Sequence, residues 1–241
     1  MHIIIHRLIK LTILLTLMTM ISYLMTKYLV SMNNKKTVKR SIKNSIVLDG
    51  TITSESYKKF IRFYRKLNKN RDIHLILHTT GGTASIAYAI GNCILNHTGT
   101  GKITCYIPYF AMSAGTIIAL CCNHIITNNH SLFSSCDNQM PINKTINHVP
   151  SSTIINIITH KKNKNEPIKE DWLAAEIEAH KLESYEKKFI KKLCDIRNYD
   201  ENIIHDELFS GKHHHNLTFT PNEINDMNFG LKITINNNTC F

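Results

Sequence analysis

The stretch Ile103–Ala119, ITCYIPYFAMSAGTIIA, decides the fold because it predicts a strand, a tight turn and a helix in direct succession. Ile103–Ile107 is a short apolar run ended by a proline, which is typical of a strand covered on both faces. The small residues of Ala111–Gly115 let the backbone turn sharply and let another segment approach closely. Thr116–Leu120 then begins an apolar helix, so Ser113 lies where a strand passes into a helix.

Ser113 has two interpretations that the local pattern alone does not separate. Serine is a preferred N-cap residue, and a serine before a helix commonly only caps it. A serine at a strand-to-helix turn is also where acyl-transfer enzymes place a nucleophile. Backbone N–H groups at the start of a helix have no intrahelical partner and favour developing negative charge. The sequence upstream favours the catalytic interpretation.

Short apolar runs alternate with segments of helical periodicity on both sides of this stretch. Such alternation predicts parallel strands joined by helical crossovers, an α/β fold. Sites in such sheets lie at the carboxyl ends of the strands. The further elements that we expect are strands over Ser45–Asp49, Ile73–His78 and Ile125–Thr127, a helix capped by Ser54 and extending to Leu67, and a helix over Thr83–Leu95.

A glycine pair, Gly81–Gly82, follows the strand that ends at His78. Two glycines after a strand are commonly just a turn. They do not form a phosphate loop, because neither the GxGxxG spacing nor a following GK[ST] is present. Both the glycine pair and Ser113 lie just past strand ends, so we expect them to meet. Backbone N–H groups of Gly81 and Gly82 could then form an oxyanion hole for attack by Ser113 on a carbonyl carbon.

Length and composition limit the classes of protein to which the chain can belong. Its 241 residues suffice for one domain with a proper core, and its net charge is +11. The basic residues cluster within 27–43 and 161–169, but no helix-turn-helix, zinc finger or aromatic RNA-binding pattern accompanies them. We therefore expect no nucleic-acid partner. The seven cysteines are scattered without a CxxC pair, which favours reduced thiols and an intracellular compartment.

The most hydrophobic segment is Leu8–Val30, with no charged residue between positions 11 and 26. With flanking lysines that snorkel, the span reaches about 20 residues, the length that a bilayer requires. A cleaved signal peptide is the main alternative, although no small-x-small cleavage site is evident. The excess of cations after the span predicts a single-pass membrane protein with most of the chain in the cytoplasm. We expect an anchor over 1–30, a basic linker over 31–44 and a polar tail over 236–241.

Three motifs together resemble a known family. LILHTTGG, AMSAGTIIAL about thirty residues later, and SLFSSCDNQ resemble the SDH-type (SppA-like) serine proteinases of the ClpP/crotonase superfamily. The resemblance runs from about Ile46 to Ile233 and implies a peptidase domain over 45–235 with a ClpP-like spiral of parallel strands and helical crossovers. It also implies a nucleophile at Ser113 and an oxyanion hole at Gly82 and the backbone of Ala114. A peptide substrate, a homo-oligomer, an N-terminal membrane anchor and the absence of a cofactor or metal are usual for this family.

The general base is left open. Relatives use a histidine–aspartate pair or a lysine, and the ClpP histidine position aligns near Asp137 here, so that triad is not preserved. The family lysine falls on Lys181, within a long helix over Glu170–Leu193. Ile177 and Ser184 share a helix face with Lys181, and an apolar face would desolvate the amine, lower its pKa and leave it neutral. The alternative is a solvated lysine on a basic helix.

The segment LFSGKHHHNLTFTPNEINDMNFGLKI also resembles a family segment, in which His215 matches a histidine and Asn216 replaces an aspartate. Asp137 and His215 are therefore auxiliary candidates. Thr220 and the proline after it predict the start of a helix. The adjacent histidines at 213–215 cannot all face one ion, so we expect no metal site.

The leading hypothesis is a membrane-anchored serine endopeptidase with Ser113 as nucleophile and Lys181 as base. A second hypothesis is a catalytically inactive relative that serves as a membrane scaffold or binding protein, which the change at Asn216 favours. A third is acyl-CoA chemistry of the crotonase type, against which the serine at the turn argues.

Overall fold

The computed structural model describes residues 18–23, 25, 27, 44–146 and 148–237. The chain separates into two compact units, Met1–Lys43 and Asn44–Phe241. In the first unit, residues 18–23 are helical. No helix among the described residues is long and apolar enough to cross a membrane. The anchor predicted over Leu8–Val30 falls largely outside those residues.

A five-stranded parallel sheet forms the centre of the second unit, in the order β1-β2-β3-β5-β10. The α/β fold predicted from the sequence is confirmed. Residues in β2 and β3 alternate between buried and half-buried, so only one face of these strands is fully covered, not both as expected. The strands are β1 (Ser45–Asp49), β2 (Ile73–His78), β3 (Ile103–Ile107), β5 (His124–Thr127) and β10 (Ile233–Ile235).

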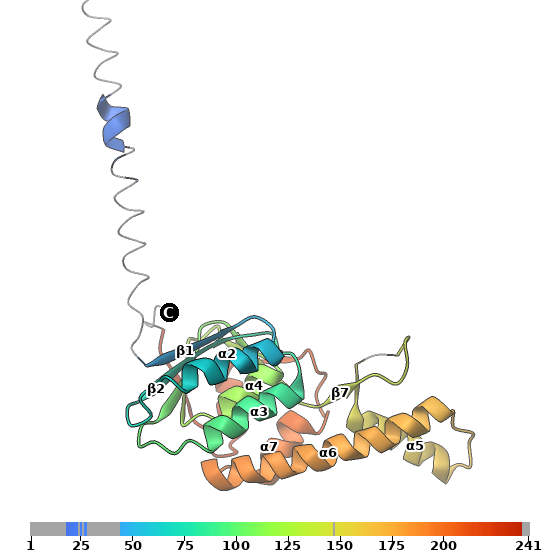
Figure 1. The fold of residues 1–241 in the computed structure, drawn as a ribbon. Helices are drawn as coiled ribbons and strands as arrows, with labels where there is room; N and C mark the ends of the chain where they lie inside the picture. Colours follow the sequence, from blue (N-terminus) through green and yellow to red (C-terminus); the bar gives the residue numbers. More distant parts are fainter. Residues whose placement is uncertain (1–17, 24, 26, 28–43, 147, 238–241) are drawn as a thin grey trace, which may run out of the picture. The chain divides into compact units, whose positions relative to one another are not determined.

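Three helices pack with this sheet (Figure 1): α2 (Ser54–Tyr64), α3 (Ala84–Leu95) and α4 (Ala114–Leu120). The N-cap of α2 is Thr53, whose capping box includes Ser56, and not Ser54 as the sequence suggested. Close packing of α3 on α4 requires a residue without a side chain at position 91, because a Cβ on Gly91 would lie 2.8 Å from Cys121 Sγ. The three helices bring large buried side chains such as Phe60 and Tyr88 into one core.

A second, three-stranded sheet has the order β4-β6-β9 and was not predicted. It consists of β4 (Phe110–Ala111), β6 (Leu132–Ser134) and β9 (Thr218–Phe219). β4 is parallel to β6, whereas β9 is antiparallel to it. This sheet positions the candidate site.

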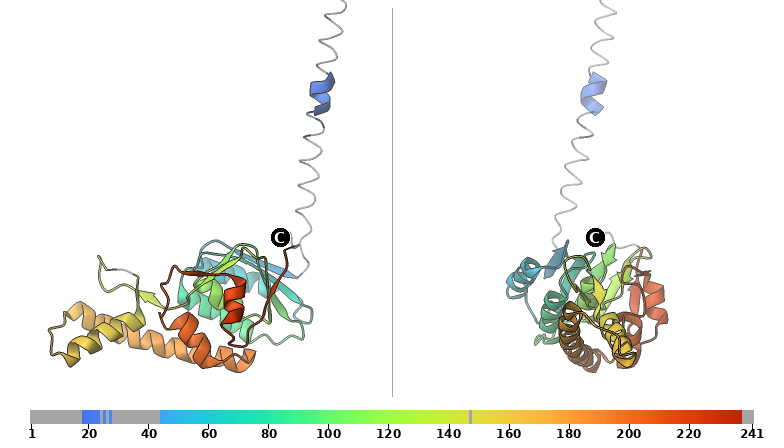
Figure 2. Two further views of the ribbon diagram at one scale, coloured as in Figure 1. Left: turned by 180° about the vertical axis from the view of Figure 1, so that it is seen from behind. Right: turned by 90° about the vertical axis from the view of Figure 1, so that its right-hand side faces the viewer.

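A helical hairpin follows the short strands β7 (Gln139–Met140) and β8 (Val149–Pro150). Helix α5 (Ser151–Asn163) lies beside the longer α6 (Glu170–Arg197), and the pair extends beyond the sheets in Figures 1 and 2. The hairpin has its own apolar cluster, made of Met140, Ile142, Ile154, Ile158, Ala175 and Ala179. The chain continues through α7 (Glu201–Ile204), a π-helix η1 (His205–Phe209) and α8 (Pro221–Asp226), which the capping box of Thr220 begins as expected.

Candidate active site

Ser113 adopts φ 50° and ψ −116°, a conformation rarely found in residues other than glycine. It occupies the N-cap position of α4, yet its side chain makes no capping hydrogen bond. Within the part of the chain that the structure describes, no hydrogen bond of Ser113 Oγ is found. The structure therefore does not support the simple capping interpretation, and it leaves the hydroxyl available.

The last residue of β6 and the segment that follows it hold this turn in place. The backbone N–H of Ser113 donates to Ser134 Oγ at 2.8 Å, and Cys136 Sγ lies 3.8 Å from the carbonyl oxygen of Ser113. Thr116 Oγ1 donates to the carbonyl oxygens of Ala111 and Ser134 at 2.6 and 3.1 Å. Burial raises the pKa of the Cys136 thiol well above its usual range, so this neighbouring sulfur stays a thiol and is a poor nucleophile.

Gly81 lies against Ser113, as the positions of the strand ends predicted, and Gly82 lies against Ile52. A Cβ on Gly81 would lie 3.0 Å from Ser113 Cβ, and a Cβ on Gly82 would lie 2.3 Å from the carbonyl oxygen of Ile52. The φ angles of Gly81 and Gly82 are +119° and +149°. Both positions therefore require glycine, for reasons of conformation and of space.

The two glycines differ in what their N–H groups do. Gly81 donates to Thr79 Oγ1 at 3.0 Å, so its N–H is already engaged. No acceptor among the described residues is found for the N–H groups of Gly82 and Ala114. Gly82 and Ala114 can therefore donate to a developing oxyanion, whereas Gly81 contributes its lack of a side chain and not a donor.

Asp137 and His215 form a close pair. His215 Nδ1 lies 2.8 Å from Asp137 Oδ1, and Asp137, which is 4% exposed, also accepts a hydrogen bond from Gln139. The register of the second sheet explains the contact, because Ser134 pairs with Thr218 in antiparallel strands. Continuing that register by three residues sets Asp137 opposite His215.

The same sheet brings this pair to the edge that carries Ser113. Ser113 follows β4 and Asp137 follows the parallel β6, while His215 precedes the antiparallel β9, so all three lie at one end of the sheet. No hydrogen bond between Ser113 Oγ and either residue is found in the described chain. His215 Nε2 likewise has no described partner.

Lys181 does not have the apolar surroundings that we expected. Its side chain is 66% exposed and forms an ion pair with Glu178 at 2.7 Å. Ile177, on the face that we expected to be apolar, is 58% exposed, and Leu173, one turn earlier, is 37% exposed. The buried face instead carries Ala175, Ala179, Glu186, Phe189, Ile190, Leu193 and Cys194.

The three adjacent histidines point to separate partners. His213 Nε2 lies 2.9 Å from Glu207 Oε2, and His214 is exposed. In the described residues, no three His, Cys, Asp or Glu side chains are placed to hold a metal ion. Asn216 is exposed, and its described contact is made by its backbone N–H. The carboxylate that holds His215 is therefore Asp137 and not residue 216.

Sequence reasoning missed Glu186. This carboxyl group is 2% exposed and lies 2.7 Å from Asn138 Nδ2, beside Asp137 in the chain. Burial raises the pKa of Glu186 to about 8. Ala175 and Ala179, four residues apart, could have indicated the buried face of α6 on which Glu186 lies. The opposite face is also partly apolar, so the sequence did not distinguish the two faces.

A serine at a strained strand-to-helix turn, with a histidine–aspartate pair at the same end of the sheet, is compatible with a serine hydrolase on an α/β fold. The family comparison agrees with this class. A profile of the ClpP-like SDH-type serine proteinases matches residues 6–239, and the chain belongs to that family.

Individual relatives are more distant. The uncharacterized protein MJ1495 of Methanocaldococcus jannaschii is 26% identical over 187 residues, which cover 77% of this chain and 60% of the relative. MJ0137 of the same organism is 28% identical over 110 residues, covering 46% of this chain and 36% of that protein. The chain thus spans less than two thirds of either curated relative.

Solved structures share the fold. The 1510-N membrane-bound stomatin-specific protease, as a serine-to-alanine mutant, has a TM-score of 0.55 and 20% identity, with 81% of each chain covered. A lysine-to-alanine mutant of the same protease, in complex with a substrate peptide, also has a TM-score of 0.55, with 18% identity and coverage of 82% of this chain and 77% of that one.

Proposed function

We propose that this protein is a serine endopeptidase whose nucleophile is Ser113. The observation that carries the proposal is the turn itself. Ser113 has a positive φ, a hydroxyl without a hydrogen-bond partner among the described residues, and a position so close to Gly81 that a Cβ there would lie 3.0 Å from Ser113 Cβ. Attack of Oγ on a peptide carbonyl would place the oxyanion near the N–H groups of Gly82 and Ala114. Losing one such donor typically reduces kcat by about 10²–10³-fold.

His215 is the base that the geometry favours. Asp137 engages its Nδ1, which leaves Nε2 to accept the proton of Ser113 Oγ and later to give it to the leaving amine. Water then hydrolyses the acyl-enzyme and returns the serine. In sites without substrate, such catalytic hydrogen bonds are often long and tighten when substrate binds.

Lys181 is the second candidate base, because relatives of this class use a lysine. A solved neighbour was captured with its substrate peptide as a lysine-to-alanine mutant. To act here, Lys181 would have to leave Glu178 and enter a dry environment. The peptide bound by that neighbour also supports a peptide or protein as the substrate of this chain.

Labelling with a fluorophosphonate, together with peptide cleavage, tests the assignment. We expect the wild type to be labelled and Ser113→Ala not to be labelled. His215→Gln should reduce labelling and cleavage by at least about 10²-fold, the usual size of general-base catalysis, while the exposed neighbour His214→Gln matches the wild type. A loss with Lys181→Ala and full activity with His215→Gln would transfer the role of base to Lys181.

The inactive scaffold and the acyl-CoA enzyme give different outcomes. Absence of labelling in folded wild-type protein would support a scaffold or binding role. This role is considered because Ser113 Oγ makes no hydrogen bond to His215 in the described chain. Binding of a coenzyme A thioester at this site would instead indicate crotonase-type chemistry.

We also propose that residues 8–30 anchor the chain in a membrane, with the peptidase domain in the cytoplasm, and that the protein is a homo-oligomer. The uncharged segment 11–26 and the cations that follow it support the anchor and its orientation. The similar protease 1510-N is described as membrane-bound. Light scattering of the detergent-solubilised chain would determine the number of subunits.

A further inference from the structure

A buried carboxyl group of α6 contacts the segment that carries Asp137. Asn138 Nδ2 donates to Glu186 Oε2 at 2.7 Å, and Tyr88 OH donates to the same oxygen at 3.3 Å. Glu186 is 2% exposed and Asn138 is 4% exposed. The three side chains come from α6, from α3 and from the segment after β6, so they join three separate elements at one point.

Asn138 is held on both its backbone and its side chain. Its carbonyl oxygen accepts from the N–H of Ser151 at 3.0 Å, and its side chain is held by Glu186. Asp137, the preceding residue, can keep its contact with His215 only while this short segment keeps its path. Tyr88 adds a link to α3, the helix that begins just after Gly82.

We propose that Glu186 is a positioning residue of the active site, which holds Asn138 so that Asp137 faces His215. The inference rests on the function proposed above, because it concerns the same histidine–aspartate pair. Glu186 contacts neither Ser113 nor a substrate position. It acts through the backbone of residues 137–138.

The charge state of Glu186 makes this role dependent on pH. Burial is the main cause that raises its pKa to about 8, and the nearby negative charges of Glu183 and Asp137 act in the same direction. At neutral pH the group is therefore mostly protonated, and above pH 8 it becomes a buried anion near Asp137. The hydrogen bond from Tyr88 and the charge of Lys187 oppose the shift.

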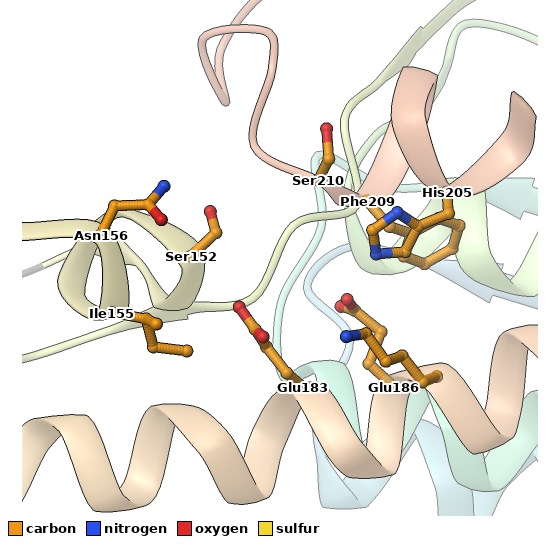
Figure 3. A pocket seen from close by; sticks show the side chains of 9 residues that line it. Ser152, Ile155, Asn156, Glu183, Glu186, His205, Phe209 and Ser210 are labelled. Atoms are coloured by element: carbon orange, nitrogen blue, oxygen red, sulfur yellow. The ribbon is translucent and has the colours of Figure 1, made fainter. Parts of the chain in front are cut away.

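A pocket beside Glu186 offers its ionised carboxylate a position away from Asn138. Glu186 lines a pocket of about 220 Å³ between α5, α6 and η1, and Glu183 and Glu186 project from α6 into this space in Figure 3. Ionisation adds a second negative charge near Asp137, so we expect repulsion between the two carboxylates to move Glu186 toward the pocket and away from Asn138. The remaining lining residues are Ser152, Ile155, Asn156, Lys187, His205, Phe209 and Ser210.

The first test is the pH profile of the full-length enzyme with Glu186→Gln, because glutamine keeps an acceptor for Asn138 but cannot ionise. We expect the wild-type kcat to fall above about pH 8 and the variant to retain its kcat there. At pH 7 the two should agree within about threefold, whereas Glu186→Ala should lower kcat about tenfold with KM nearly unchanged. Glu183→Gln, one turn earlier in the same pocket, is the matched control. It removes a charge that raises the pKa of Glu186, so its alkaline loss of kcat should move to lower pH but should not disappear. Identical alkaline profiles for the wild type and Glu186→Gln would overturn the proposal.

A second readout does not depend on peptidase activity. The imidazole ¹⁵N and ring N–H resonances of His215, assigned with His215→Gln, report its hydrogen bond to Asp137. We expect this signature to be lost above about pH 8 in the wild type and to persist in Glu186→Gln. A difference between the two proteins supports the positioning role even if Ser113 is never labelled, in which case only the peptidase assignment fails. Coincident spectra over the whole range contradict the positioning role, even in an active enzyme.

Discussion

At the scale of single residues, the candidate site contains two energetically unfavourable features, a strained backbone at Ser113 and a buried ionisable side chain at Glu186. Ser113 has a backbone conformation that costs on the order of 1–3 kcal/mol, and such strain persists only where the surroundings enforce it. Here Ser134 Oγ holds the N–H of Ser113, and the missing side chain of Gly81 makes room for it. Glu186 is a second costly group, because its ionised form is buried. The backbone strain and the burial of an ionisable group thus occur at residues that we place in or beside the proposed catalytic site.

The buried carboxyl group predicts how stability depends on pH. The pKa of Glu186 is raised from 4.5 to about 8, so between these values the folded state binds more protons than the unfolded state. Its contribution to stability is fully present below about pH 4.5 and is lost as the pH rises toward 8. Glu186→Gln does not titrate, so its melting temperature should exceed that of the wild type by an amount that grows with pH. At roughly 2–4 °C per kcal/mol, a gain of several degrees by pH 8 is expected in thermal unfolding.

The variant Glu183→Gln is the control for this gain in melting temperature. Measured at the same pH values, it separates the ionisation of Glu186 from a general loss of negative charge. A constant offset between wild type and Glu186→Gln from pH 5 to pH 9 would show that Glu186 ionises freely in the folded protein.

At the scale of elements, the second sheet assembles the site. Its strands are only two or three residues long, and Thr116 of α4 ties two of them together, with Oγ1 bonded to β4 at Ala111 and to β6 at Ser134. The hydroxyl thus fastens the turn of Ser113 to the segment that leads to Asp137.

This role predicts the effect of Thr116→Val. The substitution keeps the shape of the side chain but leaves buried backbone groups without a partner, which should lower the free energy of unfolding by about 1–3 kcal/mol. Urea denaturation provides the measurement. Thr127→Val is the matched control, because Thr127 is fully buried and its Oγ1 has no partner among the described residues. We expect this control to be neutral or stabilising, and equal losses in both variants would contradict the role of Thr116.

At the scale of the whole molecule, the division at Lys43 separates two units of different character. The hydrophobic core of the described residues lies entirely within the second unit, from Ile46 to Ile233. The candidate site residues, from Gly81 to His215, belong to the same unit. We therefore expect the second unit to fold and to carry out the proposed catalysis without the first, which contains the proposed anchor.

Removing residues 1–43 tests whether the second unit folds and acts alone and whether the first unit holds the membrane anchor. We expect the remaining chain to melt within about 2 °C of the full-length protein, since the described core runs from Ile46 to Ile233, and to be labelled equally by a fluorophosphonate. The full-length protein should remain in the membrane pellet after alkaline carbonate extraction, and the shortened protein should stay in the supernatant. Recovery of both proteins in the supernatant would remove the anchor.

The sequence by itself determined the parallel sheet, the turn at Ser113 and its meeting with the glycine pair. These features depend on short-range signals: buried apolar runs, turns of small residues and the rule that parallel strands end at one edge. The family followed from the same motifs, and the profile match confirms it. The sequence did not show that the N–H of Gly81 is already engaged, because this depends on its hydrogen bond to Thr79 Oγ1 in the folded chain.

Only the tertiary structure decided which groups lie at the end of the second sheet that carries Ser113. His215 and Asp137 are 78 residues apart, and their contact depends on the register of strands too short to show any periodicity. The face of α6 was equally undetermined, since apolar side chains occur on both sides of this helix and only packing against α3 and α5 buries one of them. That packing exposes Lys181 and buries Glu186, because a helix face is chosen by what it contacts and not by its own sequence alone.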